Sequence, residues 1–97
     1  MDFEWDETKR LANLEKHGID FLDAMEMWQG NVFEVLSPQT GHGETRYLAI
    51  GAIHGTVVTV IFTWREGNRR LISARRARPH ERKDYDEAFG RGRRRPH

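Results

Sequence analysis

The stretch ETRYLAIGAIHGTVVTVIFTWREGNRRLISARR, residues 44–76, decides the fold. Three runs within it, residues 44–53, 56–64 and 69–76, are rich in the β-branched and aromatic residues typical of strands. His54-Gly55 and Gly67-Asn68 separate these runs as short turn signals, which predict two consecutive hairpins. A fourth run at residues 32–36 precedes them, before the turn-rich segment SPQTGHG. Together the four runs predict an antiparallel meander.

Two helices are expected before the strands. Asp6 is a suitable N-cap for a helix over residues 7–17, and Gly18 suits the left-handed position that ends it. Asp20 is a second N-cap, for a helix that ends at Gly30. In the first helix Leu11 and Leu14 share a face; in the second helix an apolar stripe predicts a core, formed by Phe21, Ala24, Met25 and Trp28.

One helix is expected after the strands. Pro79 opens it, and it covers residues 79–89, with Tyr85 and Phe89 one turn apart to dock it. The order of two helices, four strands and one helix predicts an α+β domain in which helices pack on one antiparallel sheet. Residues 1–89 form this single domain, and the basic residues 90–97 are expected to be a disordered tail.

Charge is segregated along the chain. Residues 1–48 carry 10 acidic and 4 basic side chains, whereas residues 49–97 carry 5 acidic and 12 basic side chains, 11 of them arginine. Arginine is favoured where a planar guanidinium binds phosphate or carboxylate through two parallel hydrogen bonds. GC-rich coding also raises arginine content. The segregation predicts an anionic partner for the second half, or one half folded over the other.

Several classes of protein are disfavoured. The chain has no cysteine, so neither disulfides nor thiolate metal sites are expected. The longest apolar run, residues 57–64, is too short to span a bilayer, and the first residues do not resemble a signal peptide, which predicts a cytoplasmic protein. The histidines show no metal-ligand spacing, so no metal or other cofactor is expected.

The hairpins predict which side chains meet. A His54-Gly55 turn places Glu44 opposite Arg65 and Arg46 opposite Thr63, on one face of the sheet. A two-residue turn at Gly67-Asn68 adds Arg70 and Arg76 to this face, whereas a three-residue turn shifts the register by one and adds Arg75 in place of Arg76. A surface ion pair contributes only about 0–1 kcal/mol, so stability alone gives little reason for this cluster.

Five ordered segments carry a resemblance to a known family. The first, FEWDETKRLANLEKHGIDFLDA, is followed by GETRYLAIG, VVTVIFTW, RLISARRA and ERKDYDEA. In this order they resemble the BrnT ribonuclease toxins of type II toxin–antitoxin systems, over residues 2–88. The resemblance implies a RelE-like fold, cleavage of RNA that inhibits translation, a BrnA-like antitoxin with a DNA-binding domain, and a complex that binds operator DNA and represses its own operon.

The residues contain the parts that metal-independent RNA cleavage needs. A base takes the proton of the 2′-hydroxyl, that oxygen attacks phosphorus, and an acid protonates the leaving 5′-oxygen while cations stabilise the phosphoryl charge. His17 is either an acid or base or a structural histidine, and Glu44 is either the base or a clamp for its arginine neighbours. The expected phosphate-binding residues of the catalytic site are Arg46, Arg65, Arg75 and Arg76. Three further residues could contact substrate, although Trp64 and Tyr85 also suit packing roles: Trp64, Arg70 and Tyr85.

Two other functions fit the composition equally well. A non-catalytic nucleic-acid-binding module would use the same arginines on phosphates. An interaction subunit would use them to bind an acidic peptide. For both the nuclease and the non-catalytic module, the affinity for nucleic acid is expected to fall with salt concentration. Only the nuclease is expected to cleave RNA in the presence of a chelator.

Overall fold

The three central strands follow the hairpin pattern of the sequence. A computed structural model describes residues 2–38 and 43–90 of the chain. In it, β3 (Tyr47–Ile53) and β4 (Thr56–Arg65) pair with Ile53 opposite Thr56 and Tyr47 opposite Phe62, which confirms the expected register of the first hairpin. His54 and Gly55 both have left-handed backbones, with φ of 51° and 83°, as a two-residue hairpin turn requires. Residues 44–46 were expected to begin this strand and lie before it.

The turn of the second hairpin differs from both expected turns, although beyond a bulge Arg75 replaces Arg76 on the side of Arg65 and Arg70, as the register shifted by one predicts. The turn between β4 and β5 (Asn68–Arg76) consists of Glu66 and Gly67, so that Arg65 lies opposite Asn68. A bulge then shifts the pairing between Ile61 and Phe62. Glu66 and Gly67 both adopt left-handed backbones, with φ of 53° and 84°, so the turn begins one residue before the predicted Gly67-Asn68. The bulge inserts an unpaired residue and changes the register along the strand, which no turn signal reveals.

The sheet has five strands where four were expected, in the order β1-β5-β4-β3-β2. β2 (Phe33–Leu36) pairs antiparallel with β3, as predicted. β1 (Phe3–Trp5) pairs parallel with β5 at the opposite edge and was not predicted. Three residues are too few to show alternation, and the parallel partner lies more than 60 residues further along the chain. The α+β class is confirmed, but a pure antiparallel meander is not.

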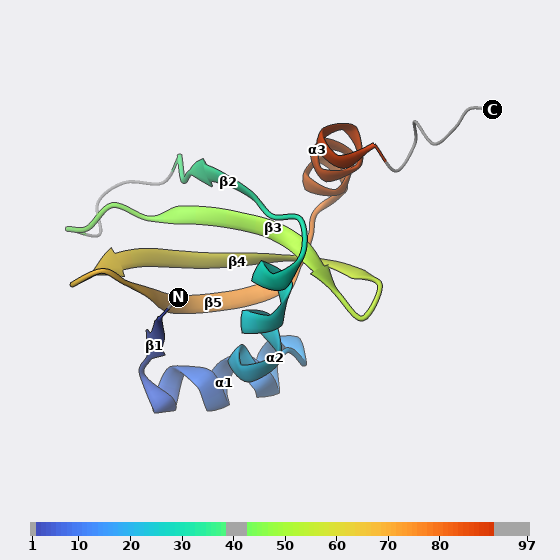
Figure 1. Cartoon of the computed structure of the whole chain (residues 1–97). Helices are drawn as coiled ribbons and strands as arrows, with labels where there is room; N and C mark the ends of the chain where they lie inside the picture. Colours follow the sequence, from blue (N-terminus) through green and yellow to red (C-terminus); the bar gives the residue numbers. More distant parts are fainter. Residues whose placement is uncertain (1, 39–42, 91–97) are drawn as a thin grey trace.

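One face of the sheet is covered by the helices α1 (Glu7–His17) and α2 (Phe21–Ala24) and by the 3₁₀ helix η1 (Met25–Gln29) (Figure 1). Both N-caps are confirmed, since Asp6 accepts from the Lys9 amide at 3.2 Å and Asp20 from the Leu22 amide at 2.9 Å. Gly18 ends α1 with φ of 74°. The chain therefore turns from α1 into α2 where the capping residues predict.

The main core lies between these helices and the sheet. Phe21 and Ala24 are buried as expected, but Met25 and Trp28 are only partly buried, and Met27 is buried instead. The change follows from the 3₁₀ geometry, because three residues per turn place Met27 in line with Phe21 and Ala24. Sheet residues complete the core, among them Ala49, Val58, Val60, Phe62, Leu71 and Ala74.

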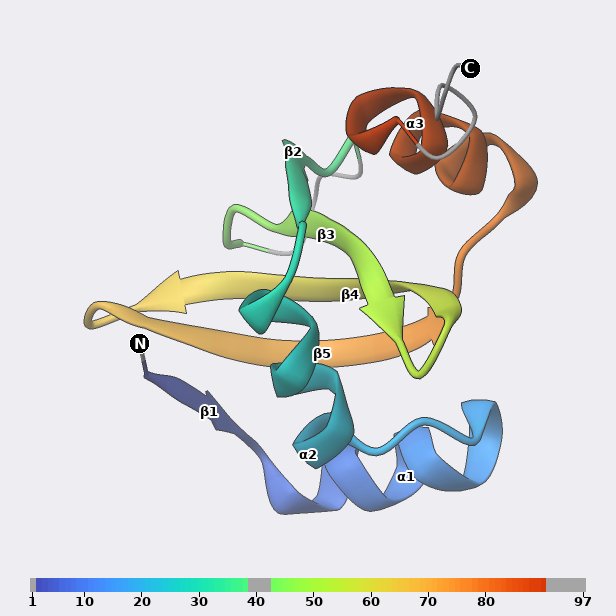
Figure 2. The ribbon, with the colours of Figure 1, turned by 45° about the vertical axis from the view of Figure 1, so that its right-hand side comes forward.

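The last helix, α3 (Pro79–Phe89), lies on the other face of the sheet, as Figures 1 and 2 show, and its predicted bounds are confirmed. A second, smaller core of Ile50, Val57 and Ala77 forms beneath it, with Tyr85 packed against them. Residues 91–97 of the expected tail and residues 39–42 of the turn-rich segment lie outside the described part. None of the helices at residues 2–38 and 43–90 is long and apolar enough to cross a membrane.

Candidate functional site on the open sheet face

α3 covers only one end of its side of the sheet. The remainder, here called the open face, is formed by β3, β4 and β5. Its side chains follow from the registers of the two hairpins and include Leu48, Ile61, Thr63, Arg65, Arg70 and Ser73. Leu48 and Ile61 are only partly buried, although they lie at the centre of the sheet. The open face is therefore a surface that a ligand or partner can reach.

A carboxylate lies between two guanidiniums at one end of the open face. Glu4 of β1 accepts from Arg70 Nη1 at 2.8 Å, and its Oε2 lies 4.0 Å from Arg65 Nε. Asn68 Nδ2 donates to the other carboxylate oxygen at 3.2 Å. The hydrogen bond from Arg70 is the main cause that lowers the pKa of Glu4. These four residues, the Glu4 cluster, hold two arginines in place around one acid.

Glu44 and Arg46 lie at the same end but form a separate pair. Arg46 Nε donates to Glu44 at 3.1 Å, just before β3 begins. The Thr63 hydroxyl donates to the carbonyl of Thr45 at 2.6 Å, which holds this segment against β4. The carboxylate expected opposite Arg65 is therefore replaced by Glu4, from a strand that the sequence did not reveal.

Arg75 lies on the same side of the sheet, at the end that α3 covers. Arg75 Nη1 and Nη2 bind the two carboxylate oxygens of Glu81 at 2.8 and 3.0 Å, and the Thr59 hydroxyl donates to Glu81 at 2.9 Å. Burial alone would raise the pKa of Glu81. The hydrogen bonds from Arg75, the Arg78 amide and Thr59 outweigh that cost and lower the pKa to about 2. Arg75 is thus held by an internal carboxylate.

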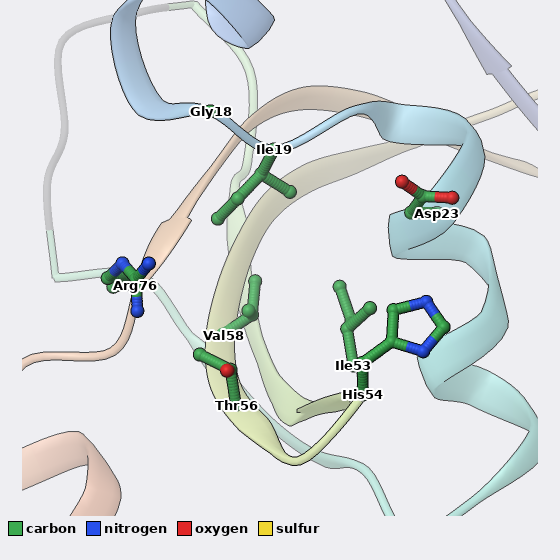
Figure 3. A pocket seen from close by; sticks show the side chains of 8 residues that line it. All are labelled: Gly18, Ile19, Asp23, Ile53, His54, Thr56, Val58 and Arg76. Atoms are coloured by element: carbon green, nitrogen blue, oxygen red, sulfur yellow. The ribbon is translucent and has the colours of Figure 1, made fainter.

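Arg76 lies on the opposite side of the sheet. Its partner across the strands is Val58, a residue of the main core, whereas Arg75 pairs with Thr59. It lines a pocket of about 220 Å³ formed with the β3–β4 turn and with the segment from Gly18 to Asp23 (Figure 3). The choice that the sequence left open is thereby decided, since Arg46, Arg65, Arg70 and Arg75 share one side and Arg76 does not.

His17 borders the open face at the edge of β5. It is half-buried and lines a shallow hollow of about 190 Å³, together with Ile72 and Ser73. Along β5 the hollow lies between Arg70 and Arg75, which are five residues apart, or roughly 16 Å at the rise of a strand. Neither the Glu4 cluster nor Arg75 forms an ion pair with His17.

The two aromatic candidates occupy different surroundings. Trp64 is 46% exposed and lies opposite Arg69, whose guanidinium carbon is 4.5 Å from the ring centroid. Trp64 is therefore on the helix side of the sheet, away from Arg65. Tyr85 packs on the small core beneath α3, with its ring centroid 4.9 Å from that of Phe89. The packing role foreseen for Tyr85 is confirmed.

Two acids at the site escaped the sequence analysis. Glu4 belongs to the three-residue β1, where Phe3 and Trp5 point into the core and leave Glu4 between them on the other side. In the sequence, only this alternation of apolar, acidic and apolar residues could have indicated that Glu4 faces the site. Glu81 is buried at 3% exposure in a helix that reads as charged throughout. Within residues 2–38 and 43–90, no group of three acidic or histidine side chains gathers to hold a metal ion.

The chain was compared with known proteins. A family model described as "Ribonuclease toxin, BrnT, of type II toxin-antitoxin system" matches residues 5–81. The chain belongs to the BrnT family. No curated protein sequence matches it. BrnT proteins are ribonuclease toxins, and their type II class implies an antitoxin partner.

The BrnT match covers the parts of the chain that build the open face. It begins at Trp5, the last residue of β1, and ends at Glu81, the acid that binds Arg75. All of β2 to β5 lies within it. The matched range therefore spans Arg46, Arg65, Arg70 and Arg75 together with His17 and Glu44, while Glu4 lies one residue outside it.

Proposed function

We propose that this BrnT protein cleaves RNA on the open face without a metal ion, and that Arg46, Arg65 and Arg70 bind the RNA backbone there. The observation that carries the proposal is that Arg65 and Arg70, from two strands, both lie around Glu4. The pair of Arg46 and Glu44 lies at the same end, on a segment that is held by Thr63, the strand partner of Arg70. Paired arginines are also pre-oriented, which reduces the entropy lost on binding.

His17 is the proposed acid or base. The hollow that it lines lies between Arg70 and Arg75 along β5, so a strand of RNA that follows β5 would pass beside its imidazole. In the proposed reaction a base removes the 2′-hydroxyl proton, the 2′-oxygen attacks phosphorus, and an acid returns a proton to the 5′-oxygen as the P–O bond breaks. Glu4 and Glu44 act as clamps, because a carboxylate stabilised by arginine is a weak base.

The remaining arginine contacts form a second part of this proposal. Arg75 would bind a phosphate at the far end of the open face, in exchange for one of its two bonds to Glu81. The geometry supports Arg75 for this role over Arg76, which lies on the other side of the sheet. Because Trp64 lies on the helix side of the sheet, it would contact RNA only if the strand extended past the edge of the open face. Tyr85 would support α3 as a wall beside Arg75.

The antitoxin is proposed to be a BrnA-like protein that covers the open face. The apolar residues at this side of the sheet support such a cover, since Leu48 and Ile61 are partly exposed and Val35 of the neighbouring β2, which lies opposite Leu48, is 36% exposed. Its DNA-binding domain would bring the complex to the operator of its own operon. Free toxin would cleave cellular RNA and inhibit translation.

A binding function without catalysis is the second candidate. It is favoured by one observation, namely that each arginine on the open face has a carboxylate neighbour in this structure. Such pairs could orient the arginines for recognition alone. Cleavage in the presence of a chelator separates the two candidates.

The test uses the purified chain free of antitoxin and a labelled RNA. We expect cleavage that EDTA does not abolish and that falls about 100-fold in Arg65→Ala and Arg70→Ala, by analogy with the loss of a single charge-stabilising group. Arg78→Ala removes the same charge from an exposed position outside the open face and serves as the matched control. Circular dichroism of each variant checks that the fold is retained.

Two results would reject this site. If Arg65→Ala and Arg70→Ala cleave as fast as the parent, the open face is not where the reaction occurs. If RNA binds but is never cut, with or without added Mg²⁺, the non-catalytic candidate is correct.

A further inference from the structure

A pocket on the helix side of the sheet is not used by the reaction proposed above. It lies where the β3–β4 turn and the end of β5 meet the link between α1 and α2 (Figure 3). Two local features of the sequence create it. Gly18 ends α1 with a left-handed backbone and turns the chain toward Ile19, and the tight turn at His54-Gly55 closes the opposite side.

The walls of the pocket are apolar and its rim is polar. Ile19, Ile53 and Val58 line it with aliphatic side chains, and polar groups surround them: Asp23, His54, Thr56 and Arg76. In Figure 3 Arg76 lies on one side, while Asp23 and His54 lie on the other side beyond the aliphatic residues. The volume of about 220 Å³ is below the roughly 300 Å³ at which pockets for drug-sized molecules begin. It suits a single ring system with a polar group at each end.

Arg76 differs from the arginines of the open face. Those arginines have carboxylate oxygens within 4.0 Å, as do Arg10, Arg69 and Arg75. Across residues 2–38 and 43–90, the side chain of Arg76 forms no such ion pair, and it is exposed at the mouth of the pocket. A guanidinium without an internal acid is free to bind phosphate with two hydrogen bonds.

Asp23 determines which end of a ligand would lie near it. Its carboxylate repels a phosphate and accepts hydrogen bonds from N–H groups. A base with an exocyclic amino group satisfies it, as in adenine, cytosine or guanine, whereas uracil presents two carbonyl oxygens around a single N–H. The polar groups thus place phosphate at Arg76 and an amino-bearing base across the aliphatic walls.

We propose that this pocket binds one nucleotide with an amino-bearing base, its ring between the aliphatic side chains and its phosphate on Arg76. The nucleotide is either free or one unit of an RNA strand. The inference does not depend on where RNA is cleaved, because the pocket and the open face lie on opposite sides of the sheet.

The test is a titration of the ¹⁵N-labelled full chain with 5′-AMP, 5′-UMP, inorganic phosphate and a short non-cleavable RNA, followed by two-dimensional NMR. We expect AMP to shift the amide signals of Ile19, Thr56 and Arg76 and to bind at least about tenfold more tightly than UMP or phosphate. Binding of the RNA at the same amides, with none by AMP, would show that the nucleotide is part of a strand. Both patterns support the pocket.

Variants give the test its controls. Arg76→Ala should weaken AMP binding about tenfold, whereas Arg78→Ala, which removes an exposed arginine outside the pocket, should leave it unchanged. Asp23→Asn should remove the preference for AMP over UMP. The proposal is overturned if neither AMP nor RNA shifts these amides, if inorganic phosphate binds as tightly as whichever of the two does shift them, or if Arg76→Ala and Arg78→Ala bind that ligand equally. Cleavage assays on the same variants report separately on the open face.

Discussion

Asn13 shows how one buried polar residue joins a helix to the edge of the sheet. Its Nδ2 donates to the carbonyls of Ile19 and Ala74 at 2.9 and 3.0 Å, and its Oδ1 accepts from the Ala74 amide at 3.0 Å. The side-chain amide therefore pairs with β5 where β1 has ended, much as another strand would. Asn13 is 6% exposed, whereas Leu11 and Leu14, which were expected to share an inward face, are 52% and 39% exposed.

We predict that Asn13→Leu lowers the free energy of unfolding by about 2–4 kcal/mol, because it leaves three backbone groups without partners. Asn13→Asp keeps the acceptor for Ala74 but loses the donors, and should also be destabilising. Urea unfolding at pH 7 measures both, with the exposed Glu15→Ala on the same helix as control. Equal stability of Asn13→Leu and the parent would show that these hydrogen bonds contribute nothing net.

Glu81 is the second residue whose burial has a measurable consequence. Its pKa falls from 4.5 to about 2 in the folded protein, so the folded state favours the charged form. The stabilisation is fully present above pH 4.5 and is lost as the pH falls toward 2. The shift corresponds to about 3 kcal/mol of stability at neutral pH.

We predict that Glu81→Gln is less stable than the parent by about 2–4 kcal/mol at pH 7, since it leaves the partly buried Arg75 without its anion. Between pH 5 and 2.5 the parent should lose stability and approach the variant, whose own profile is flatter. Urea midpoints across this range provide the measurement. Asp84→Asn, an exposed change on α3, is the control, and a parallel pH profile for parent and Glu81→Gln would contradict the assignment.

At the scale of elements, the contact between η1 and β3 depends on a missing side chain. A Cβ at Gly51 would lie 3.1 Å from Met27 Sδ and 3.3 Å from Met27 Cβ. Met27 is buried because the 3₁₀ geometry aligns it with the core residues of α2. Gly51 therefore permits the close approach of η1 to the sheet, although the residue lies in a strand, where glycine is usually unfavourable.

We predict that Gly51→Ala destabilises the protein by about 1–3 kcal/mol through overpacking. The cost should be smaller in a Met27→Ala background, where the two nearest atoms, Sδ and Cγ of Met27, are absent and only Cβ remains. A double-mutant cycle from urea unfolding measures this coupling. Additive effects of the two substitutions would mean that the contact with Met27 is not the cause.

At the scale of the whole molecule, the charge segregation along the chain is explained partly by ion pairs between the two halves and partly by positive charge that stays exposed. Glu4 binds Arg70 and approaches Arg65, and Glu34 binds Arg69, so acids of the first half neutralise arginines of the second half. The prediction that one half folds over the other is thus confirmed in part. Over the described residues 2–38 and 43–90, the exposed side chains of Arg76 and Lys83 form no ion pair with a carboxylate, which leaves positive charge for an anionic partner.

We predict that RNA binding weakens steeply with salt. With four phosphate contacts on the open face, from Arg46, Arg65, Arg70 and Arg75, the slope of log K against log salt concentration should be about −3 for a single strand. Arg46→Ala should reduce its magnitude by roughly 0.7, whereas Arg78→Ala should leave it nearly unchanged. Fluorescence anisotropy at several salt concentrations measures the slopes. An unaltered slope in Arg46→Ala would exclude that residue from the phosphate contacts.

The parts that could be predicted from the sequence are those with local causes. N-cap acids, a C-terminal glycine, Pro79 and the His54-Gly55 turn act within a few residues, so the bounds of α1 and α3 and the register of the first hairpin followed from them. The resemblance to BrnT followed from ordered short segments in the same way. These features depend on backbone preferences that the neighbouring residues alone satisfy.

Tertiary structure alone decided the arrangement of the charged groups. The pairing of β1 with β5, which brings Glu4 to Arg70, joins segments more than 60 residues apart. The bulge at Ile72, the unpaired residue of β5, decided that Arg75 faces α3 while Arg76 faces the pocket. Neither has a local signature, because the side of the sheet on which a residue lies depends on register, and a shift of one residue reverses it.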